Sequence, residues 1–169
     1  MASDDITIRR VRPGDADTLR EVRLRMLLID PASFSSTHAD EAALAQAHWV
    51  ERARTLAHGD EAAQLLALDA SGPVGTIVGV RDADDPALFH VYSMWVAPER
   101  RRSGLGAQLL ADLEAWIMGA GGREAELAVT SAAPVAARLY AAAGYEPDGH
   151  QAPSRHTPGL IEHSLRKRL

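Results

Sequence analysis

The sequence of 169 residues lacks cysteine altogether. This absence excludes a disulfide framework, a cysteine-ligated zinc site and a cysteine nucleophile. The sequence also lacks an apolar run long enough to cross a bilayer. Its first residues, Met1 to Asp5, carry neither the cationic nor the apolar region of a signal peptide. We therefore expect a soluble cytoplasmic protein without a membrane partner.

Basic residues are fewer than acidic ones. The 18 lysines and arginines against 23 aspartates and glutamates give a net charge of −5 at pH 7. A general nucleic-acid binder would be basic, so nucleic acid is not an expected partner. The length and the 46% hydrophobic content predict one globular domain over residues 1–169. His48 and His58 do not share a helix face as a zinc pair would, and we expect no metal site.

The hydrophobic periodicity predicts a mixed α/β domain in the order β α α β β β α β α β β. Thr37 followed by Asp40 is typical of a helix N-cap, and the apolar face that follows predicts a single second helix. Gly144 stands where a glycine would end the last helix. The expected strands are Ile6–Val11, Ala63–Asp69, Val74–Arg81, Leu88–Val96, Glu124–Thr130 and a closing pair from Tyr145 and at Leu160–Leu165. The expected helices are Asp15–Ile29, Thr37 to Gly59, Leu105 to Gly121 and Ala136 to Ala143.

The segment from Met94 to Gly106 carries the most chemical information. In it a strand ends, a turn with Gly104 and Gly106 follows, and a helix begins. A helix N-terminus leaves backbone N–H groups unpaired at the positive end of its dipole, and glycines let a phosphate approach them. This favours an anion cradle for a pyrophosphate, although the same residues also fit a tight turn with exposed arginines. The turn is neither a Walker loop nor a Rossmann fingerprint, because the Gly-Lys-Ser/Thr of the first and the third glycine of the second are missing.

Two segments of the sequence have a recognisable pattern. Arg101-Arg102-Ser103-Gly104-Leu105-Gly106 follows the pattern Arg/Gln-x-x-Gly-x-Gly/Ala. Leu139-Tyr140-Ala141-Ala142-Ala143-Gly144-Tyr145 lies later in the chain and is similar to the pattern Leu-Tyr…Gly-Phe. With both patterns, and with an element order that fits from Ile6 to Leu169, the sequence resembles the GNAT superfamily of acetyl-CoA-dependent N-acetyltransferases. The resemblance implies a mixed, mostly antiparallel sheet of about six to seven strands with flanking helices, in which two central strands splay apart.

The resemblance also implies acetyl-CoA as a co-substrate and no metal. The coenzyme would lie where the strand ending at Val96 splays from the strand Glu124–Thr130. Its pantetheine would run along the backbone of Met94 and Val96 like an added strand, and its pyrophosphate would lie on the amides that follow. The residues implied to bind it are Met94, Trp95, Val96, Arg101, Arg102, Ser103, Gly104, Leu105, Gly106 and Ala107.

The family mechanism is direct attack of a primary amine on the thioester in a ternary complex, which involves an acid and a base. Tyr140 stands where many members carry a tyrosine beside the coenzyme sulfur; the alternative is an aromatic side chain packed in the core. His90 stands where several members carry a strand base, and a histidine with a pKa of about 6.5 can accept a proton at neutral pH. The alternative for His90 is a half-buried histidine with a structural hydrogen bond. Strand alternation predicts one face with His90, Tyr92, Met94 and Val96, and an opposite face with Phe89, Val91, Ser93 and Trp95.

The acceptor is implied to be an amine of a small molecule or a peptide. It would enter among the segment Ile29–Thr37, the surroundings of Trp49 and the segment Gln151–Leu160, with the loop Pro153–Pro158 bordering its pocket. Three carboxylates there either attract an ammonium group or are solvated helix charges: Asp30, Glu41 and Glu51. Dimers are common in this family, which leaves a homodimer open.

Two other functions stay open at this point. Many relatives have an asparagine that contacts the coenzyme at the position of Ala133, so here the contact is absent or made by Thr130 or Ser131. This leaves room for a non-catalytic acetyl-CoA- or CoA-binding sensor or interaction module, whereas intact Tyr140 and His90 favour an enzyme. A nucleotide-binding module is disfavoured, because the lysine and the carboxylate that would serve a phosphate-bound metal are missing.

Overall fold

The computed structural model describes residues 5–154 and 157–169. No helix in these ranges is both long and apolar enough to span a membrane. The strands are β1 (Thr7–Arg10), β2 (Ala62–Asp69), β3 (Gly72–Arg81), β4 (Leu88–Val96), β5 (Glu124–Thr130), β6 (Glu146–Pro153) and β7 (Ile161–Arg168). The helices are α1 (Ala16–Ile29), α2 (His38–Ala42), α3 (Gln46–Ala57), α4 (Leu105–Gly119) and α5 (Pro134–Ala142), with 3-10 helices η1 (Pro31–Ser33) and η2 (Pro98–Arg100).

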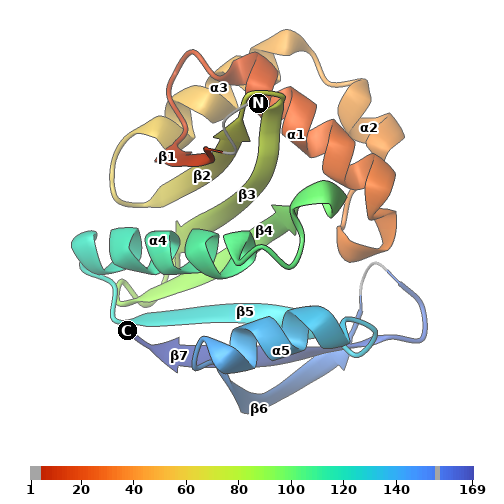
Figure 1. The fold of residues 1–169 in the computed structure, drawn as a ribbon. Coiled ribbons are helices and arrows are strands. Elements are labelled where there is room, and N and C mark those ends of the chain that lie inside the picture. Colours follow the sequence, from red (N-terminus) through yellow and green to blue (C-terminus); the bar gives the residue numbers. More distant parts are fainter. Residues whose placement is uncertain (1–4, 155–156) are drawn as a thin grey trace.

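The strands form one open seven-stranded sheet in the order β1-β2-β3-β4-β5-β7-β6. Neighbouring strands are antiparallel except for β4 and β5, which run parallel. β4 and β5 pair from Leu88 opposite Glu124 to His90 opposite Glu126, and their pairing ends there. Beyond His90 the two strands diverge, toward the right in Figure 1. The predicted mixed sheet with splayed central strands is confirmed.

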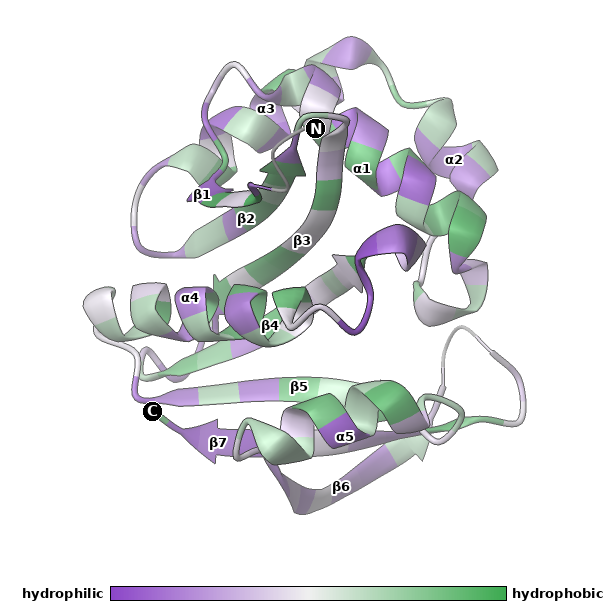
Figure 2. Ribbon diagram, in the orientation of Figure 1, coloured by the Kyte–Doolittle hydropathy of each residue, from purple (hydrophilic) through white to green (hydrophobic). Residues whose placement is uncertain are grey.

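Helices cover the sheet on both faces. α4 packs on one face of β3 through Leu109 and Leu113, whose methyl groups lie close to Gly75 and Gly79. α5 lies on the same side of the sheet as α4, and Figure 1 shows both in front of it. α1 contacts β3 from the other side, and α3 packs on α1 and β2. Figure 2 shows the segment between β4 and α4 as a strongly hydrophilic stretch between two more hydrophobic elements.

The second helix, predicted as one piece, is two helices. Thr37 caps α2 as predicted, because its Oγ1 accepts a hydrogen bond from the Asp40 backbone N at 3.1 Å. α2 then ends at Ala42, and Ala45 is the extended N-cap residue of α3. The predicted continuous helix from Thr37 to Gly59 is wrong. The break falls in an alanine-rich stretch where every residue has a high helix propensity, so no local signal marks it.

β4 contains a bulge. Val78 of β3 pairs with Tyr92, whereas Thr76 pairs with Trp95, so β4 has one residue more than β3 over this stretch. Ser93 lies in the extra stretch with a φ of 51°, in the left-handed region that non-glycine residues rarely adopt. An extra residue reverses the alternation of side chains beyond it.

After the bulge, Met94 and Val96 point toward α4. Both lie within 4 Å of the place that a side chain at Gly106 would take. Trp95 points the other way, toward α1, and its Nε1 donates a hydrogen bond to Asp30 Oδ2 at 2.7 Å. The bulge therefore aims two residues of β4 into the splayed gap beside α4.

Before the bulge, the odd-numbered residues of β4 point toward α4 and the even-numbered ones point away from it. Phe89 packs edge-on against an aromatic ring of α4, with centroids 5.5 Å apart. His90 points to the opposite side, where its ring stacks on Tyr92 at 5.9 Å. The predicted common face of His90 and Tyr92 with Met94 and Val96 is therefore wrong, because strict alternation assumes a strand without an extra residue.

Candidate active site

The start of α4 presents free backbone amides. Gly104 is the N-cap residue with a φ of 86°, a conformation that glycine adopts without strain. Among the described residues no side chain caps this helix, and Gln108 N makes a backbone hydrogen bond to Gly104 O at 3.1 Å. The amides of Leu105, Gly106 and Ala107 precede that bond and point out of the helix at the positive end of its dipole. This arrangement can bind an anion such as the pyrophosphate predicted here.

The residues before α4 differ in what they contact. Arg101 donates from Nε to the Val96 carbonyl oxygen at 3.0 Å and from Nη2 to Asp30 Oδ2 at 2.5 Å. The Ser103 hydroxyl donates to a carbonyl oxygen of η2 at 2.7 Å. Arg102 is exposed, with a left-handed φ of 59°. Arg101 and Ser103 thus hold the turn in shape, while Arg102 adds positive charge at its surface.

Tyr140 of α5 meets Met94 beside the splayed strands. Its hydroxyl donates to Met94 Sδ at 3.5 Å, and Tyr140 is only 9% exposed. Burial raises the pKa of Tyr140 to about 12, so the phenol keeps its proton at neutral pH and stays a hydrogen-bond donor. A Cβ at Gly106 would lie 3.1 Å from Met94 Cε and 3.6 Å from Leu139 Cδ2. The gap is therefore bordered by the Tyr140 hydroxyl, the Met94 thioether and Gly106 at the start of α4.

His90 lies between two carboxylates at the last paired residues of β4 and β5. Its Nε2 is 2.8 Å from Asp82 Oδ2, and its Nδ1 is 3.5 Å from Glu126 Oε1. Asp82 also accepts hydrogen bonds from the backbone N of Asp84 and Asp85, and the bond from His90 with these two holds the pKa of Asp82 at about 2. The ionised Asp82 can only accept a hydrogen bond, so it holds a proton on Nε2 of His90 and leaves Nδ1, on the side of Glu126, as the other nitrogen of the ring.

The two carboxylates beside His90 cannot be predicted from the alternation of residues along β4. Asp82 lies in the turn after β3, and Glu126 comes from β5, so cross-strand register brings both to His90. Arg166 of β7 in turn donates to Glu126 Oε2 at 2.7 Å. Tyr92 is 53% exposed beside them. In the described ranges no group of three or more acidic or histidine side chains is arranged to hold a metal ion.

The three predicted acceptor carboxylates are each paired within the chain: Asp30 with Arg101, Glu41 with Arg23 and Glu51 with Arg54. Trp49 is fully buried and cannot touch an acceptor. Thr157 Oγ1 donates to the Ala32 carbonyl oxygen at 3.4 Å, which joins two of the predicted acceptor segments. Arg155 and His156 of the predicted loop lie outside the described residues.

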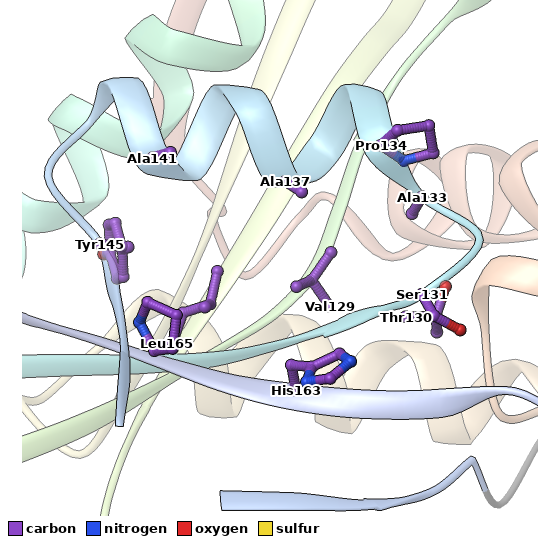
Figure 3. A pocket seen from close by; sticks show the side chains of 11 residues that line it. Val129, Thr130, Ser131, Ala133, Pro134, Ala137, Ala141, Tyr145, His163 and Leu165 are labelled. Carbon is purple, nitrogen blue, oxygen red and sulfur yellow. The ribbon is translucent and has the colours of Figure 1, made fainter. Parts of the chain in front are cut away.

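A separate apolar cavity of about 310 Å³ lies beneath α5. Figure 3 shows small side chains of α5 above Val129 and Leu165 of the sheet. The lining residues are Val129, Thr130, Ser131, Ala133, Pro134, Ala137, Ala141, Tyr145, Pro147, His163 and Leu165. Tyr140 is not one of them, so the cavity lies on a different face of α5 from the splayed gap. Ala133, the position of the family asparagine, lies at this cavity.

Comparison with known proteins gives one consistent family. Residues 23–145 match the family model described as Acetyltransferase (GNAT) family. A mycothiol acetyltransferase from Pseudarthrobacter chlorophenolicus is 35% identical over 111 residues, which are 63% of this chain and 32% of that protein. An acetyltransferase of the GNAT family from Streptococcus pneumoniae has a TM-score of 0.82 at 20% identity, over 98% of this chain and 100% of the other. A phosphinothricin acetyltransferase from Sinorhizobium meliloti, solved with AcCoA, has a TM-score of 0.76 at 22% identity, over 97% and 88% of the two chains.

Proposed function

Because the chain belongs to the Acetyltransferase (GNAT) family, we propose that it transfers an acetyl group from acetyl-CoA to a primary amine of a small molecule or peptide. The observation that carries this proposal is the splayed gap between β4 and β5. Free amides of α4 lie on one side of it, and the Tyr140 hydroxyl points at a sulfur atom beside it. The mycothiol and phosphinothricin acetyltransferases are named for different compounds, so the proposed acceptor is defined by its amine alone.

In this proposal the gap holds the coenzyme. The backbone of β4 at Met94 and Val96 stops pairing with β5, so its polar groups are available to an extended pantetheine arm. The amides from Leu105 to Ala107 would bind the pyrophosphate, and Arg102 would add positive charge. The Val96 carbonyl oxygen accepts a hydrogen bond from Arg101 Nε. For the pantetheine arm to bond to this oxygen, Arg101 would have to share it or move away.

The amine nitrogen attacks the thioester carbonyl carbon directly. The new C–N bond forms, the C–S bond breaks, and the electron pair of that bond leaves on the sulfur. The attacking nitrogen then gives up its surplus proton, directly or through water, to the departing sulfur, which leaves as a thiol. Tyr140 would donate a hydrogen bond to the sulfur of the coenzyme. In the structure its hydroxyl donates to a sulfur nearby, that of Met94. With a pKa of about 12, Tyr140 is a weaker acid than a thiol at about 8.5. It would therefore stabilise the leaving thiolate by hydrogen bonding rather than by giving up its proton completely.

The ammonium form of the acceptor must lose a proton before it attacks. His90 would accept this proton at Nδ1, directly or through water, while Asp82 stabilises the resulting imidazolium through Nε2. His90 and Tyr140 would thus act from opposite faces of the sheet, with the thioester between them. The alternative is that His90 has only a structural role, held between Asp82 and Glu126.

Titration calorimetry with acetyl-CoA tests the binding half of the proposal. We expect binding of acetyl-CoA, and no binding of ATP at the same concentration, because the turn lacks the lysine of a nucleotide-binding loop. Tight binding of ATP with none of acetyl-CoA would instead support a nucleotide-binding module. Binding of acetyl-CoA without transfer to any amine would support the non-catalytic sensor.

A further inference from the structure

A cluster of two arginines and one carboxylate borders the gap from the α1 side. Arg23 donates from Nε to Glu41 Oε1 at 2.9 Å. It also donates to the hydroxyl oxygens of Ser36 at 2.8 Å and Ser93 at 3.4 Å. The Arg23 and Glu41 side chains are only 13% and 12% exposed. Because Ser93 directly precedes the residue that meets Tyr140, the cluster lies next to the proposed reaction site.

Arg52 is the second arginine of this cluster: it lies on α3, which packs on α1, the helix that carries Arg23, and its charge acts on Glu41. It is part-buried, and burial together with the charge of Arg23 lowers its pKa, while Glu41 opposes this effect. Within residues 5–154 and 157–169 its guanidinium has no hydrogen-bond or ion-pair partner. A guanidinium carries five N–H donors and remains charged, so among the described residues Arg52 has donors available to an anionic group of a ligand. Two arginines against one carboxylate also leave a local positive charge, in a chain of net charge −5.

The neighbouring stretch of β4 and β5 carries the opposite charge. Asp82 and Glu126 flank His90, which precedes Ser93 by three residues on β4. Arg166 pairs with Glu126, so two carboxylates face one arginine here and a negative charge remains. At about 3.3 Å per residue, His90 and Ser93 are about 10 Å apart along the strand. The proposed acceptor side therefore has carboxylates near one end and an unpaired arginine near the other. This pattern suits a molecule with an ammonium group and an anionic group.

Resting on the proposed function, we infer that the acceptor carries a carboxylate besides its amine, as a free amino acid does, and that Arg52 binds this carboxylate. Arg23 is already held by three side chains and shapes the wall of the site. Arg52 is free to form the bidentate pair that a guanidinium fork makes with a carboxylate. An amine without an anionic group would leave Arg52 unpaired in the complex, which disfavours it as an acceptor.

The test measures acetyl transfer to the common free L-amino acids and to the same amino acids as primary carboxamides. Wild type is expected to prefer acids over their carboxamides. Arg52→Gln should raise KM for the best acid about 10- to 100-fold, because a charge-assisted pair is lost, and should leave KM for its carboxamide unchanged. Arg52→Lys keeps the charge without the fork and should raise KM for the acid to a smaller extent. Arg54→Gln is the control, since Arg54 lies on the same helix, 69% exposed and paired with Glu51, and we expect no change.

Melting curves and acetyl-CoA calorimetry establish that each variant folds and binds the coenzyme. Equal use of acids and carboxamides by wild type would overturn the inference, as would equal effects of Arg52→Gln on both. If Arg52→Gln does not fold, the KM for the acid in Arg52→Lys decides, and an unchanged value overturns the inference. Transfer to spermidine with none to the amino acids would overturn it too and leave the proposed function standing. Failure of wild type to bind acetyl-CoA would overturn both.

Discussion

Gly106 is the position where a branched side chain should narrow the proposed coenzyme gap. A Cβ there would lie 3.1 Å from Met94 Cε and 3.7 Å from Val96 Cγ2. The signature accepts glycine or alanine at this position, so the larger Gly106→Val is the test. Its two extra methyl groups should lower the affinity for acetyl-CoA about tenfold, because the gap beside Met94 has no room for them. Calorimetry measures the affinity.

Gly119→Val is the matched control, because Gly119 lies in the same helix and a Cβ there meets nothing within 4 Å. This variant should change the melting temperature little, since valine and glycine differ by only a few tenths of a kcal/mol in helix propensity. Its affinity for acetyl-CoA should equal that of wild type. Unchanged affinity in Gly106→Val would remove the coenzyme from this part of the gap.

Tyr140→Phe removes the hydroxyl that points at Met94 beside the gap and keeps the ring. If the hydroxyl stabilises the leaving thiolate, kcat should fall about 100-fold while the affinity for acetyl-CoA stays the same. Tyr145→Phe is the control, because the Tyr145 side chain is buried beside Glu114 and lines the cavity beneath α5, which Tyr140 does not line. Steady-state kinetics of the two variants separate the roles. Equal rates in Tyr140→Phe and wild type would make Tyr140 a packing residue.

The pairing of His90 with Asp82 predicts a particular pH dependence. If His90 accepts the proton, kcat/KM should rise with pH along one acidic limb, and His90→Gln should lose that limb and most of the rate. Asp82→Asn should move the limb to lower pH, because the protonated ring loses its counter-charge. A limb that survives in His90→Gln, with a melting temperature near wild type, would give His90 a structural role only.

The residues that sequence alone can predict are those that belong to a local motif. Gly104 has its positive φ because a turn into a helix requires it, and such a turn can be recognised from neighbouring residues. The bulge at Ser93 has no such signature, since a serine with a φ of 51° is held there by its surroundings. The contacts of His90 with Asp82 and Glu126 and the free guanidinium of Arg52 also depend on distant strands and helices. These features shape the proposed acceptor side, so the sequence predicts that side less well than the turn into α4.

Among the elements, α4 and β7 are joined by a part-buried ion pair. Lys167 Nζ donates to Glu114 Oε2 at 2.7 Å, and the two side chains are 24% and 11% exposed. This pair links the helix beside β4 to a strand beyond β5, so it spans the splayed region. It also lies against Tyr145, over whose ring the ammonium stands at 5.7 Å.

Lys167→Met should destabilise the fold by about 3 kcal/mol, because it leaves the Glu114 carboxylate buried without its counter-charge. Adding Glu114→Gln should recover most of the loss, since the uncompensated charge is then removed. Urea unfolding of the single and double variants measures both values. A single variant as stable as wild type would show that the pair does not hold α4 to β7.

A helix or strand can be predicted from the sequence where its apolar residues recur at regular spacing and a glycine or proline marks its end. β2 and β3 are found from their apolar runs, and Gly144, with a φ of 94°, ends α5 as predicted. The division between α2 and α3 is not found, because no glycine, proline or change of period marks the residues after Ala42. A tertiary cause decides there: α3 packs Trp49 fully buried among α1 and the sheet. Local propensity cannot report such packing.

In the molecule as a whole, two surfaces of opposite charge lie on opposite sides of the splayed gap. The amides of α4 and Arg102 favour the anionic coenzyme on one side. The carboxylates around His90 favour an ammonium group on the other, with Arg52 beside them. The splay of β4 from β5 is what lets the two meet, because it opens the sheet between its faces.

Acceptor-dependent release of coenzyme A is the measurement that tests the central claim most directly. Wild type is incubated with acetyl-CoA and a panel of free amines, and thiol release is followed together with the mass of the amine. We predict that one class of amine accelerates thiol release over the rate without amine, and that this amine gains one acetyl group for each thiol released. Binding of acetyl-CoA with no amine-dependent release across the panel would contradict the account.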